Sequence, residues 1–436
     1  MSAPIVCKFG GASLATATAV RKAVAIVQAD GRRRYVVPSA AGSRYQDDPK
    51  VTDIIRDCLK ARSEFRPFKK EFDDIAGRYK DIVCGLGLEM SICGALDQLR
   101  EAIESKRAAL AESRGEYIMA LIMARVLDRP FVDASELIKF ERTGINFDLT
   151  YDLIHERLKD CPGAVIPGYY GSNLCDGSVR LLARDGSDIS GSLVARGVGA
   201  QLYENWSNVS GALTADPRVV ADARTIPRMS HYELRELAAA GATVMHYGAV
   251  KPVMQAGIPI YMRNTFDPDG PFTEVTREVR HERGTVIGVA GRRGFYALTI
   301  SDTGAYDTDD FMLRVTTILH TLHVPIRNMS DGFDEVTFLI DAIPERIDEV
   351  VGALRHKLFD AEIEYLPAAR VALIGQGMTG NLGFLGRAAS ALGENGINIL
   401  CPSQSAKERS IIFGIAERDL DTAIRVLHAG FVERSE

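Results

Sequence analysis

The 436-residue sequence has little of several features that would point to particular classes of protein. It has no surplus of positive charge, because 52 lysines and arginines stand against 58 aspartates and glutamates and the net charge is −6. This balance does not favour a nucleic-acid partner. The most apolar run, "YIMALIMARVL", is interrupted by Arg125 and is too short to span a bilayer. The N-terminus lacks a signal-peptide pattern, so we expect neither a membrane protein nor a secreted one.

The cysteines do not form a recognisable framework. There are seven, an odd number, and no two of them have the C-x-x-C spacing of a zinc or redox motif. Scattered cysteines of this kind are typical of reduced thiols rather than disulfides. We therefore expect a cytoplasmic protein. The seven are Cys7, Cys58, Cys84, Cys93, Cys161, Cys175 and Cys401.

The length predicts two to four domains, and the patterns of the two parts of the chain differ. Up to about residue 265, apolar β-rich runs alternate with helical periods, which indicates a mainly parallel sheet with helices on both faces. Residues 53–128 are almost wholly helical and amphipathic, so we expect a helical subdomain there. Pro, Gly and Asp accumulate around "NTFDPDGPF", and the first domain is therefore assigned to residues 1–283.

The C-terminal part repeats a β-α-β-β-α pattern twice, with a period of about 75 residues. This predicts two ferredoxin-like modules, over residues 284–369 and 370–436. The second has no final edge strand of its own, so we expect it to share the strand near 285–291. Such modules have exposed strand edges that often pair, which favours a homodimer formed through this part of the chain.

At the start of the chain, Lys8 precedes the pair Gly10-Gly11 where an apolar strand is followed by a helical period. Glycines at such a junction let a ligand approach the backbone, and the N–H groups at the start of a helix attract anions. A lysine at this point suggests phosphate. The alternative is a tight turn with a solvated lysine. The spacing matches neither G-x-x-x-x-G-K-[ST] nor G-x-G-x-x-G.

Four further stretches carry polar residues where strands meet helices. Ser39 follows an apolar strand in "VVPSAAG", and Glu116 is expected in the first turn of the apolar helix of "SRGEYIMALIMA". "LLARDGSDIS" places Asp188 between a strand and a helix, and Asp216-Pro217-Arg218 is expected in a turn. Taken one at a time, each is equally well explained as a helix-start acid or a plain turn.

Together these stretches resemble the aspartokinases of the amino-acid kinase family over essentially the whole chain. The resemblance is carried by "KFGGASL", "PSA" with "KVTD", "SRGE", "RDGSD", "NWSNVSGALTADPR", "YELRELAAAGATVMH", "IPIYMRNT" and the "GQGM" module of the tail. It implies transfer of the γ-phosphoryl group of ATP to the side-chain carboxylate of L-aspartate, which starts lysine, threonine, methionine or osmolyte synthesis. It also implies that the C-terminal modules are regulatory ACT domains.

The resemblance implies a role for each site residue. The catalytic pair would be Lys8, which would hold the transferred group, and Asp188, which would organise Lys8 and the metal-phosphate end. The aspartate-binding residues would be Ser39, Thr52, Glu116, Arg184 and Ser187. The ATP-binding residues would be Lys8, Gly10, Gly11, Ser207, Asn208, Leu213 and Arg218. Mg²⁺ would be bound mainly through the ATP phosphates, with no protein ligand assigned.

Four positions depart from the family pattern, and all of them bear on ATP affinity. Asp185 replaces one of two glycines before Ser-Asp and adds a carboxylate that would repel phosphate unless it turns away or reaches the metal. Ala12 replaces a hydroxyl residue, Asn208 an aspartate that is often present, and Thr243 a lysine on the phosphate side.

The regulatory expectation rests on a difference between the two repeats. In the first, the loop before the first helix contains Asp302, Asp307, Asp309 and Asp310, which would repel the carboxylate of an amino-acid effector. The matching loop of the second repeat, residues 375–384, contains glycines and amides and no acid. We therefore expect lysine or threonine to bind there. The effector-binding residues would be Met378, Gly383 and Phe384.

Three alternatives remain at this stage. The first is another kinase of the same fold, acting on glutamate, N-acetylglutamate, a glutamyl group, carbamate or UMP. The second is a weakly catalytic protein that binds amino acids and regulates a partner. The third concerns regulation alone: an unregulated enzyme in which both module loops are plain turns.

Overall fold

The computed structural model describes residues 3–183, 186–242, 244–302, 311–359 and 361–432. Within it the chain divides into two compact units. Unit 1 consists of Met1–Ala212, Pro227–His231 and Met245–Val279. Unit 2 consists of Leu213–Ile226, Tyr232–Val244 and Arg280–Glu436. The division is not a single cut, because two segments that precede residue 283 in the chain belong to the same unit as the C-terminal part.

A seven-stranded sheet forms the centre of unit 1, in the order β5-β2-β1-β8-β10-β11-β9. Its strands are β1 (Ile5–Phe9), β2 (Arg33–Pro38), β5 (Ala164–Val165), β8 (Leu202–Ser207), β9 (Arg228–Ser230), β10 (Ile260–Asn264) and β11 (Thr273–Thr276). Neighbouring strands are parallel, except that β10 and β11 are antiparallel. The predicted α/β fold with a mainly parallel sheet is confirmed.

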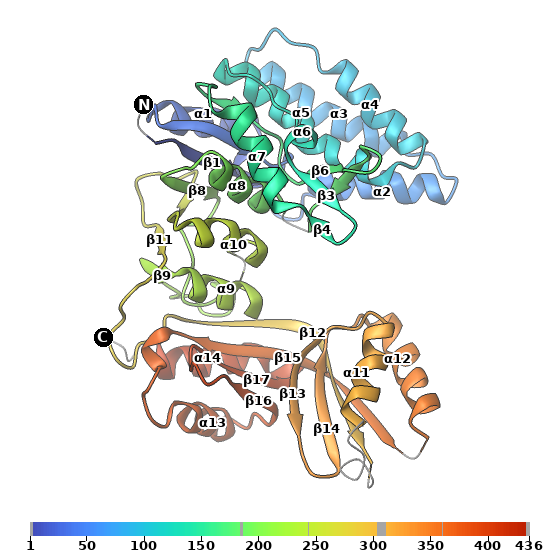
Figure 1. Cartoon of the computed structure of the whole chain (residues 1–436), viewed down its shortest axis with the longest axis vertical. Helices are drawn as coiled ribbons and strands as arrows, with labels where there is room; N and C mark the ends of the chain where they lie inside the picture. The colour runs from blue at the N-terminus through green and yellow to red at the C-terminus, as the bar shows by residue number, and fades with distance from the viewer. Residues whose placement is uncertain (1–2, 184–185, 243, 303–310, 360, 433–436) are drawn as a thin grey trace. The chain divides into compact units, whose positions relative to one another are not determined.

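Helices cover both faces of this sheet (Figure 1). On one face, Cys7 and Phe9 of β1 belong to a large apolar core that also contains residues of five helices. These helices are α1 (Ala17–Gln28), α2 (Val51–Ser63), α3 (Lys69–Gly85), α4 (Cys93–Glu104) and α5 (Ala108–Leu127). Because strand side chains alternate, Lys8 points to the opposite face, where α8 (Gly186–Gly197) packs beside α10 (Tyr247–Ala256).

A small second sheet completes unit 1, in the order β4-β3-β6-β7. Its strands are β3 (Lys139–Glu141), β4 (Gly144–Ile145), β6 (Tyr170–Asn173) and β7 (Val179–Leu181). The helices α6 (Ala134–Leu137) and α7 (Phe147–Leu158) lie near it in the chain.

A six-stranded antiparallel sheet organises unit 2, in the order β13-β14-β12-β15-β17-β16. Its strands are β12 (Gly288–Ser301), β13 (Ile326–Asp331), β14 (Glu335–Ile340), β15 (Glu362–Ile374), β16 (Ile399–Gln404) and β17 (Ser410–Ala416). Its helices are α9 (His231–Ala240, from Tyr232 on), α11 (Phe311–Thr321), α12 (Pro344–Lys357), η3 (Gln376–Met378), α13 (Phe384–Glu394), η4 (Glu417–Asp419) and α14 (Leu420–Phe431).

The two β-α-β-β-α repeats are joined through the long central strands β12 and β15. The first part of β12, Gly288–Gly291, pairs with Val371–Ile374 at the end of β15, and the later part of β12 pairs with the start of β15. Each long strand therefore serves both modules. The two edge strands are also linked, because the Asn328 side chain of β13 donates to the Cys401 carbonyl of β16 at 3.2 Å.

The segment Leu213–Ile226 is part of the unit 2 core. The Val289 N–H of β12 donates to the Thr214 carbonyl at 2.8 Å. Ala215 and Val220 pack in the apolar cluster of the second module. His428 of α14 is hydrogen-bonded to the Thr214 hydroxyl at 3.0 Å.

One local expectation was wrong. Glu116 does not lie in the first turn of its helix, because α5 already begins at Ala108. Gly115 does not end the helix but lets it approach a loop, since a Cβ there would lie 2.8 Å from the Ala40 side chain. The helix after the glycine pair begins only at Ala17, where the Thr16 hydroxyl caps it, and a 3-10 turn (η1, Gly11–Leu14) comes in between.

Candidate active site

Lys8 and Asp188, the two predicted catalytic residues, form a buried ion pair. Lys8 is the penultimate residue of β1, and Asp188 lies in the first turn of α8. Lys8 Nζ is 2.6 Å from Asp188 Oδ1, and less than a tenth of either residue is exposed. The pair lies near the carboxyl ends of parallel strands, where α/β proteins commonly bind their ligands.

Both carboxylate oxygens of Asp188 have further partners. Asn205 Nδ2 of β8 donates to Oδ1 at 3.2 Å, and the His246 N–H donates to Oδ2 at 3.0 Å. The Tyr203 hydroxyl donates to the backbone carbonyl of Asp188 at 3.1 Å. Asp188 is therefore held by one cation and by neutral donors from two other segments.

The glycine loop after β1 lies directly against the loop after β2. The Gly10 N–H donates to the Trp206 carbonyl at 2.8 Å, and the Gly42 N–H donates to the Gly11 carbonyl at 2.9 Å. A Cβ at Gly42 would lie 2.4 Å from the Gly11 carbonyl carbon, and a Cβ at Gly11 would lie 3.1 Å from the Ala40 carbonyl oxygen. The close contact of the two backbones therefore requires glycine.

Three of the predicted aspartate-binding residues are connected through these loops. The Ser39 N–H donates to the Phe9 carbonyl at 3.0 Å, and the next residue, Ala40, donates its N–H to the Glu116 carboxylate. Gly168 lies in close contact with the Ser187 side chain, because a Cβ at Gly168 would be only 2.6 Å from Ser187 Oγ. The Gly168 N–H in turn donates to the Pro38 carbonyl at the end of β2. Thr52 is the second residue of α2 and is half-buried, and Arg184 lies outside the described residues.

Glu116 is an acid in an apolar environment. Its Oε2 is buried and has no hydrogen-bond partner among the described residues. Burial raises its pKa from 4.5 to about 8, against the opposing effect of the Ala40 N–H. A cationic group placed beside Glu116 would favour its charged form.

The residues predicted to bind ATP do not all lie in one unit. Gly10, Gly11 and Ser207 belong to unit 1, as does Asn208, which is exposed after the end of β8. Leu213 and Arg218 belong to unit 2. Arg218 lies in the expected turn and pairs with Asp216 at 2.6 Å, and its side chain is mostly exposed. Thr243 and Asp185 lie outside the described residues.

The loop predicted to bind an effector has acidic neighbours that the sequence pattern did not indicate. Met378 and Phe384 are buried, and Gly383 has φ +80° just before α13. The Gln376 N–H donates to Glu233 Oε1 at 2.9 Å, and the Gly380 N–H donates to the Glu408 carboxylate. The loop itself contains no acid, but distant segments place two carboxylates against its backbone N–H groups. Asp307, Asp309 and Asp310 of the first repeat lie outside the described residues.

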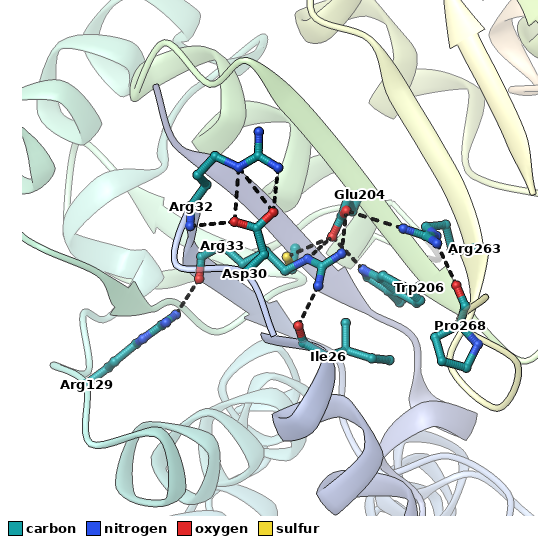
Figure 2. Close-up of polar contacts among 10 residues, drawn as sticks. Ile26, Asp30, Arg32, Arg33, Arg129, Glu204, Trp206, Arg263 and Pro268 are labelled. Atoms are coloured by element: carbon teal, nitrogen blue, oxygen red, sulfur yellow. Dashed lines mark hydrogen bonds and ion pairs between the residues drawn. The ribbon is translucent and has the colours of Figure 1, made fainter. Parts of the chain in front are cut away.

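Sequence reasoning missed a buried polar network on the other face of β8, centred on Glu204 (Figure 2). Arg33 donates to both carboxylate oxygens of Glu204 at 2.8 and 3.0 Å, and Trp206 Nε1 donates to Oε2 at 2.9 Å. Arg263 Nη1 lies 4.0 Å from Oε1. Burial and the nearby carboxylate raise the pKa of the Cys7 thiol, which donates to Glu204. The sequence did contain a signal for this network: Glu204 and Trp206 alternate with Asn205 in β8, so the two must lie on the same face of the strand.

Two kinds of feature are absent from the described residues. None of the helices in this part of the chain is both long enough and apolar enough to cross a membrane. Likewise, within the described ranges, no group of three or more His, Cys, Asp or Glu side chains is arranged to hold a metal ion.

Comparisons with known proteins agree over nearly the whole chain. The model of the Amino acid kinase family matches residues 3–264, and an ACT domain model matches residues 371–431. The chain is 30% identical to Aspartokinase 3 of Bacillus subtilis, and the match covers 98% of both chains. It is 35% identical to the crystal structure of Clostridium acetobutylicum aspartate kinase, described as an allosteric enzyme, with a TM-score of 0.86 and coverage of 98% and 100%.

A third likeness concerns the fold alone. The structure of E. coli aspartokinase III in complex with aspartate and ADP superposes with a TM-score of 0.84 at 22% identity, and the match covers 98% of this chain and 99% of that one.

Proposed function

The chain belongs to the amino acid kinase family and is an aspartokinase, and from this premise we propose which of its residues carry the reaction. The reaction transfers the γ-phosphoryl group of ATP to the side-chain carboxylate of L-aspartate, giving 4-phospho-L-aspartate and ADP. The observation that carries the assignment is the buried pair of Lys8 and Asp188 at the carboxyl ends of parallel strands.

Lys8 neutralises charge on the transferred group. Phosphoryl transfer depends on in-line positioning and on stabilising the negative charge of the phosphoryl oxygens. A lysine at the end of β1 suits this task, and the Gly11 N–H adds a weaker donor, since the Gly10 N–H already donates to the Trp206 carbonyl. The acceptor is already a carboxylate, so no general base is required. Asp188 keeps the Lys8 ammonium in place and removes no proton.

Aspartate is recognised by its two charged α-groups. Arg184 pairs with the α-carboxylate through a planar fork, and Glu116 accepts from the ammonium group. The hydroxyls of Ser39, Thr52 and Ser187 complete the pocket. The observed links between the loops of Ser39, Glu116 and Ser187 support this grouping.

The nucleotide contacts its own set of residues. We assign Ser207, Asn208, Leu213 and Arg218 to it. Mg²⁺ is held chiefly by the phosphates of ATP, since both carboxylate oxygens of Asp188 already accept from protein donors. When bound, the ion neutralises phosphate charge.

Regulation is proposed at the second ACT module. Lysine or threonine binds the loop of residues 375–384, beside Met378, Gly383 and Phe384. Glu408 occupies the Gly380 N–H, so the carboxylate of an incoming effector would have to displace it. A homodimer formed through the ACT modules and a cytoplasmic location complete the proposal, the latter because the described cysteines are all free thiols.

An ADP-release assay with three acceptors tests the function. L-Aspartate should support turnover, and L-glutamate and N-acetyl-L-glutamate should not. Lys8→Ala should lower turnover at least about 100-fold, because Lys8 supplies charge to the transferred group. The protein should stay folded with a lower thermal midpoint, because the variant leaves the buried Asp188 carboxylate without its cation. Lys22→Ala, on the exposed surface of α1, is the matched control and should behave like the parent. Turnover of Lys8→Ala within tenfold of the parent would contradict the assignment.

A further inference from the structure

Asn205 touches the Lys8–Asp188 pair but has no part in the function described above. We propose that Asn205 is a positioning residue: its side-chain amide fixes the orientation of the Asp188 carboxylate and, through it, the place of the Lys8 ammonium. The inference rests on the proposed roles of Lys8 and Asp188.

The register of the sheet puts Asn205 beside Lys8. In the parallel pairing of β1 and β8, the Cα of Lys8 is opposite that of Asn205. Both side chains reach Asp188, so they lie on the face of the sheet that α8 covers. Asn205 is only 3% exposed. Three side chains from β1, β8 and α8 therefore meet in a space closed to water.

Only one orientation of the Asn205 amide suits this position. A carboxylate accepts hydrogen bonds and cannot donate them, so the NH₂ group must face Asp188. The other end of the amide, Oδ1, is then buried with no hydrogen-bond partner among the described residues. Leaving a buried acceptor unsatisfied costs about 1–3 kcal/mol, and an apolar side chain would avoid this cost. The amide is thus better explained by what it does for Asp188 than by stability.

The Glu204 network holds the backbone of Asn205 in place. Glu204 precedes Asn205 in β8, so its side chain points to the opposite face of the sheet. There it contacts Arg33 (Figure 2). It binds Arg33, the first residue of β2, and lies near Arg263 of β10. The strand that carries Asn205 is therefore tied to two other strands of the sheet, which limits its movement under the site.

The role of Asn205 follows from what Lys8 must do during transfer. When the Lys8 ammonium turns toward the phosphoryl oxygens, its bond to Asp188 weakens. The Asn205 amide on Oδ1 and the His246 N–H on Oδ2 then keep the carboxylate in place. Lys8 can thus contact phosphate without losing the anion that orients it.

The test removes the amide but keeps the side-chain volume. Asn205→Leu should lower kcat about 10- to 100-fold and leave the KM for aspartate unchanged, the range found for residues that orient functional groups. Asn173→Leu at the end of β6 is the matched control: it makes the same substitution at a partly exposed asparagine whose amide donates to Ser178, and kcat should not change.

A double variant separates this inference from the proposed function. If Asn205 acts through Lys8, adding Asn205→Leu to Lys8→Ala should lower turnover no further. A kcat of Asn205→Leu within threefold of the parent, or losses that multiply in the double variant, would overturn the inference. A nearly normal kcat in Lys8→Ala alone would instead overturn the proposed role of Lys8. If Asn205→Leu does not fold, Asn205→Ser removes the same hydrogen bond and is judged by the same outcomes.

Discussion

Glu116 should release a proton when aspartate binds. Its carboxyl is buried in α5, and burial raises its pKa to about 8. The proposed role requires the charged form, because a carboxylate accepts from the substrate ammonium. Binding at neutral pH must therefore drive off the proton that Glu116 carries in the free enzyme.

The expected size of the effect follows from this pKa. A group with a pKa of 8 is about 90% protonated at pH 7, about 50% at pH 8 and about 10% at pH 9. Aspartate binding should thus release about 0.9 proton at pH 7 and about 0.1 at pH 9. Only about a tenth of the enzyme has a charged Glu116 and can bind aspartate at pH 7. The apparent dissociation constant for aspartate should therefore fall about tenfold between pH 7 and pH 9.

Calorimetry measures the released proton directly. Aspartate is titrated into the enzyme at pH 7 and pH 9, in phosphate and in Tris, and the dependence of the binding enthalpy on the ionisation enthalpy of the buffer gives the proton count. Glu116→Gln keeps the shape of the side chain but carries no titratable proton, so it should release almost none. A release below about 0.2 proton from the parent at pH 7, or an equal release from Glu116→Gln, would refute the reasoning.

The same pKa has a consequence for stability. Glu116 has a higher pKa in the folded protein than the usual 4.5, so the folded state favours the protonated form. Above pH 4.5 the unfolded chain loses this proton while the folded protein keeps it, so the free energy of unfolding falls as the pH rises. The fall is complete above pH 8, where it amounts to about 5 kcal/mol. Glu116→Gln should raise the thermal midpoint at pH 8 and have little effect at pH 4.5. An unchanged midpoint at pH 8 would contradict the pKa.

Three further predictions concern other parts of the chain. Arg184→Lys should raise the KM for aspartate about tenfold or more, since a point charge cannot reproduce a planar fork, and an unchanged KM would remove Arg184 from the pocket. Gly383→Asp should abolish the binding of lysine or threonine measured by calorimetry, whereas Gly386→Asp, at a position of α13 that faces open space, should not. Equal binding by both variants would show that the loop of residues 375–384 is not the effector site. Arg33→Leu leaves Glu204 with an uncompensated buried charge and should lower the free energy of unfolding by about 3–5 kcal/mol. Denaturant unfolding followed by the fluorescence of the single tryptophan measures this change, and a smaller loss would mean that Arg33 is not the main partner of Glu204.

The sequence alone was sufficient for the features that depend on local periodicity and on motif order. Alternating strand and helix patterns predicted the mainly parallel sheet, and the repeated pattern predicted the paired C-terminal modules. The position of Lys8 at the end of an apolar strand suggested a phosphate site. The order of the motifs then identified the family, because motif order is a property of the chain itself. The start of α5 was misjudged, since Glu116 was expected in the first turn of a helix that already begins at Ala108.

The tertiary structure decided what depends on contacts between distant segments. Strand register placed Asn205 beside Lys8, and the side-chain alternation of β8 placed Glu204 among the arginines of two other strands. Burial by surrounding elements, rather than the position of Glu116 in its helix, raised the pKa of that acid. The Glu408 carboxylate reached the Gly380 N–H from a loop 28 residues away. Registers, burial and such contacts arise only when separate segments pack together, and the pattern of residues within any one segment does not record them.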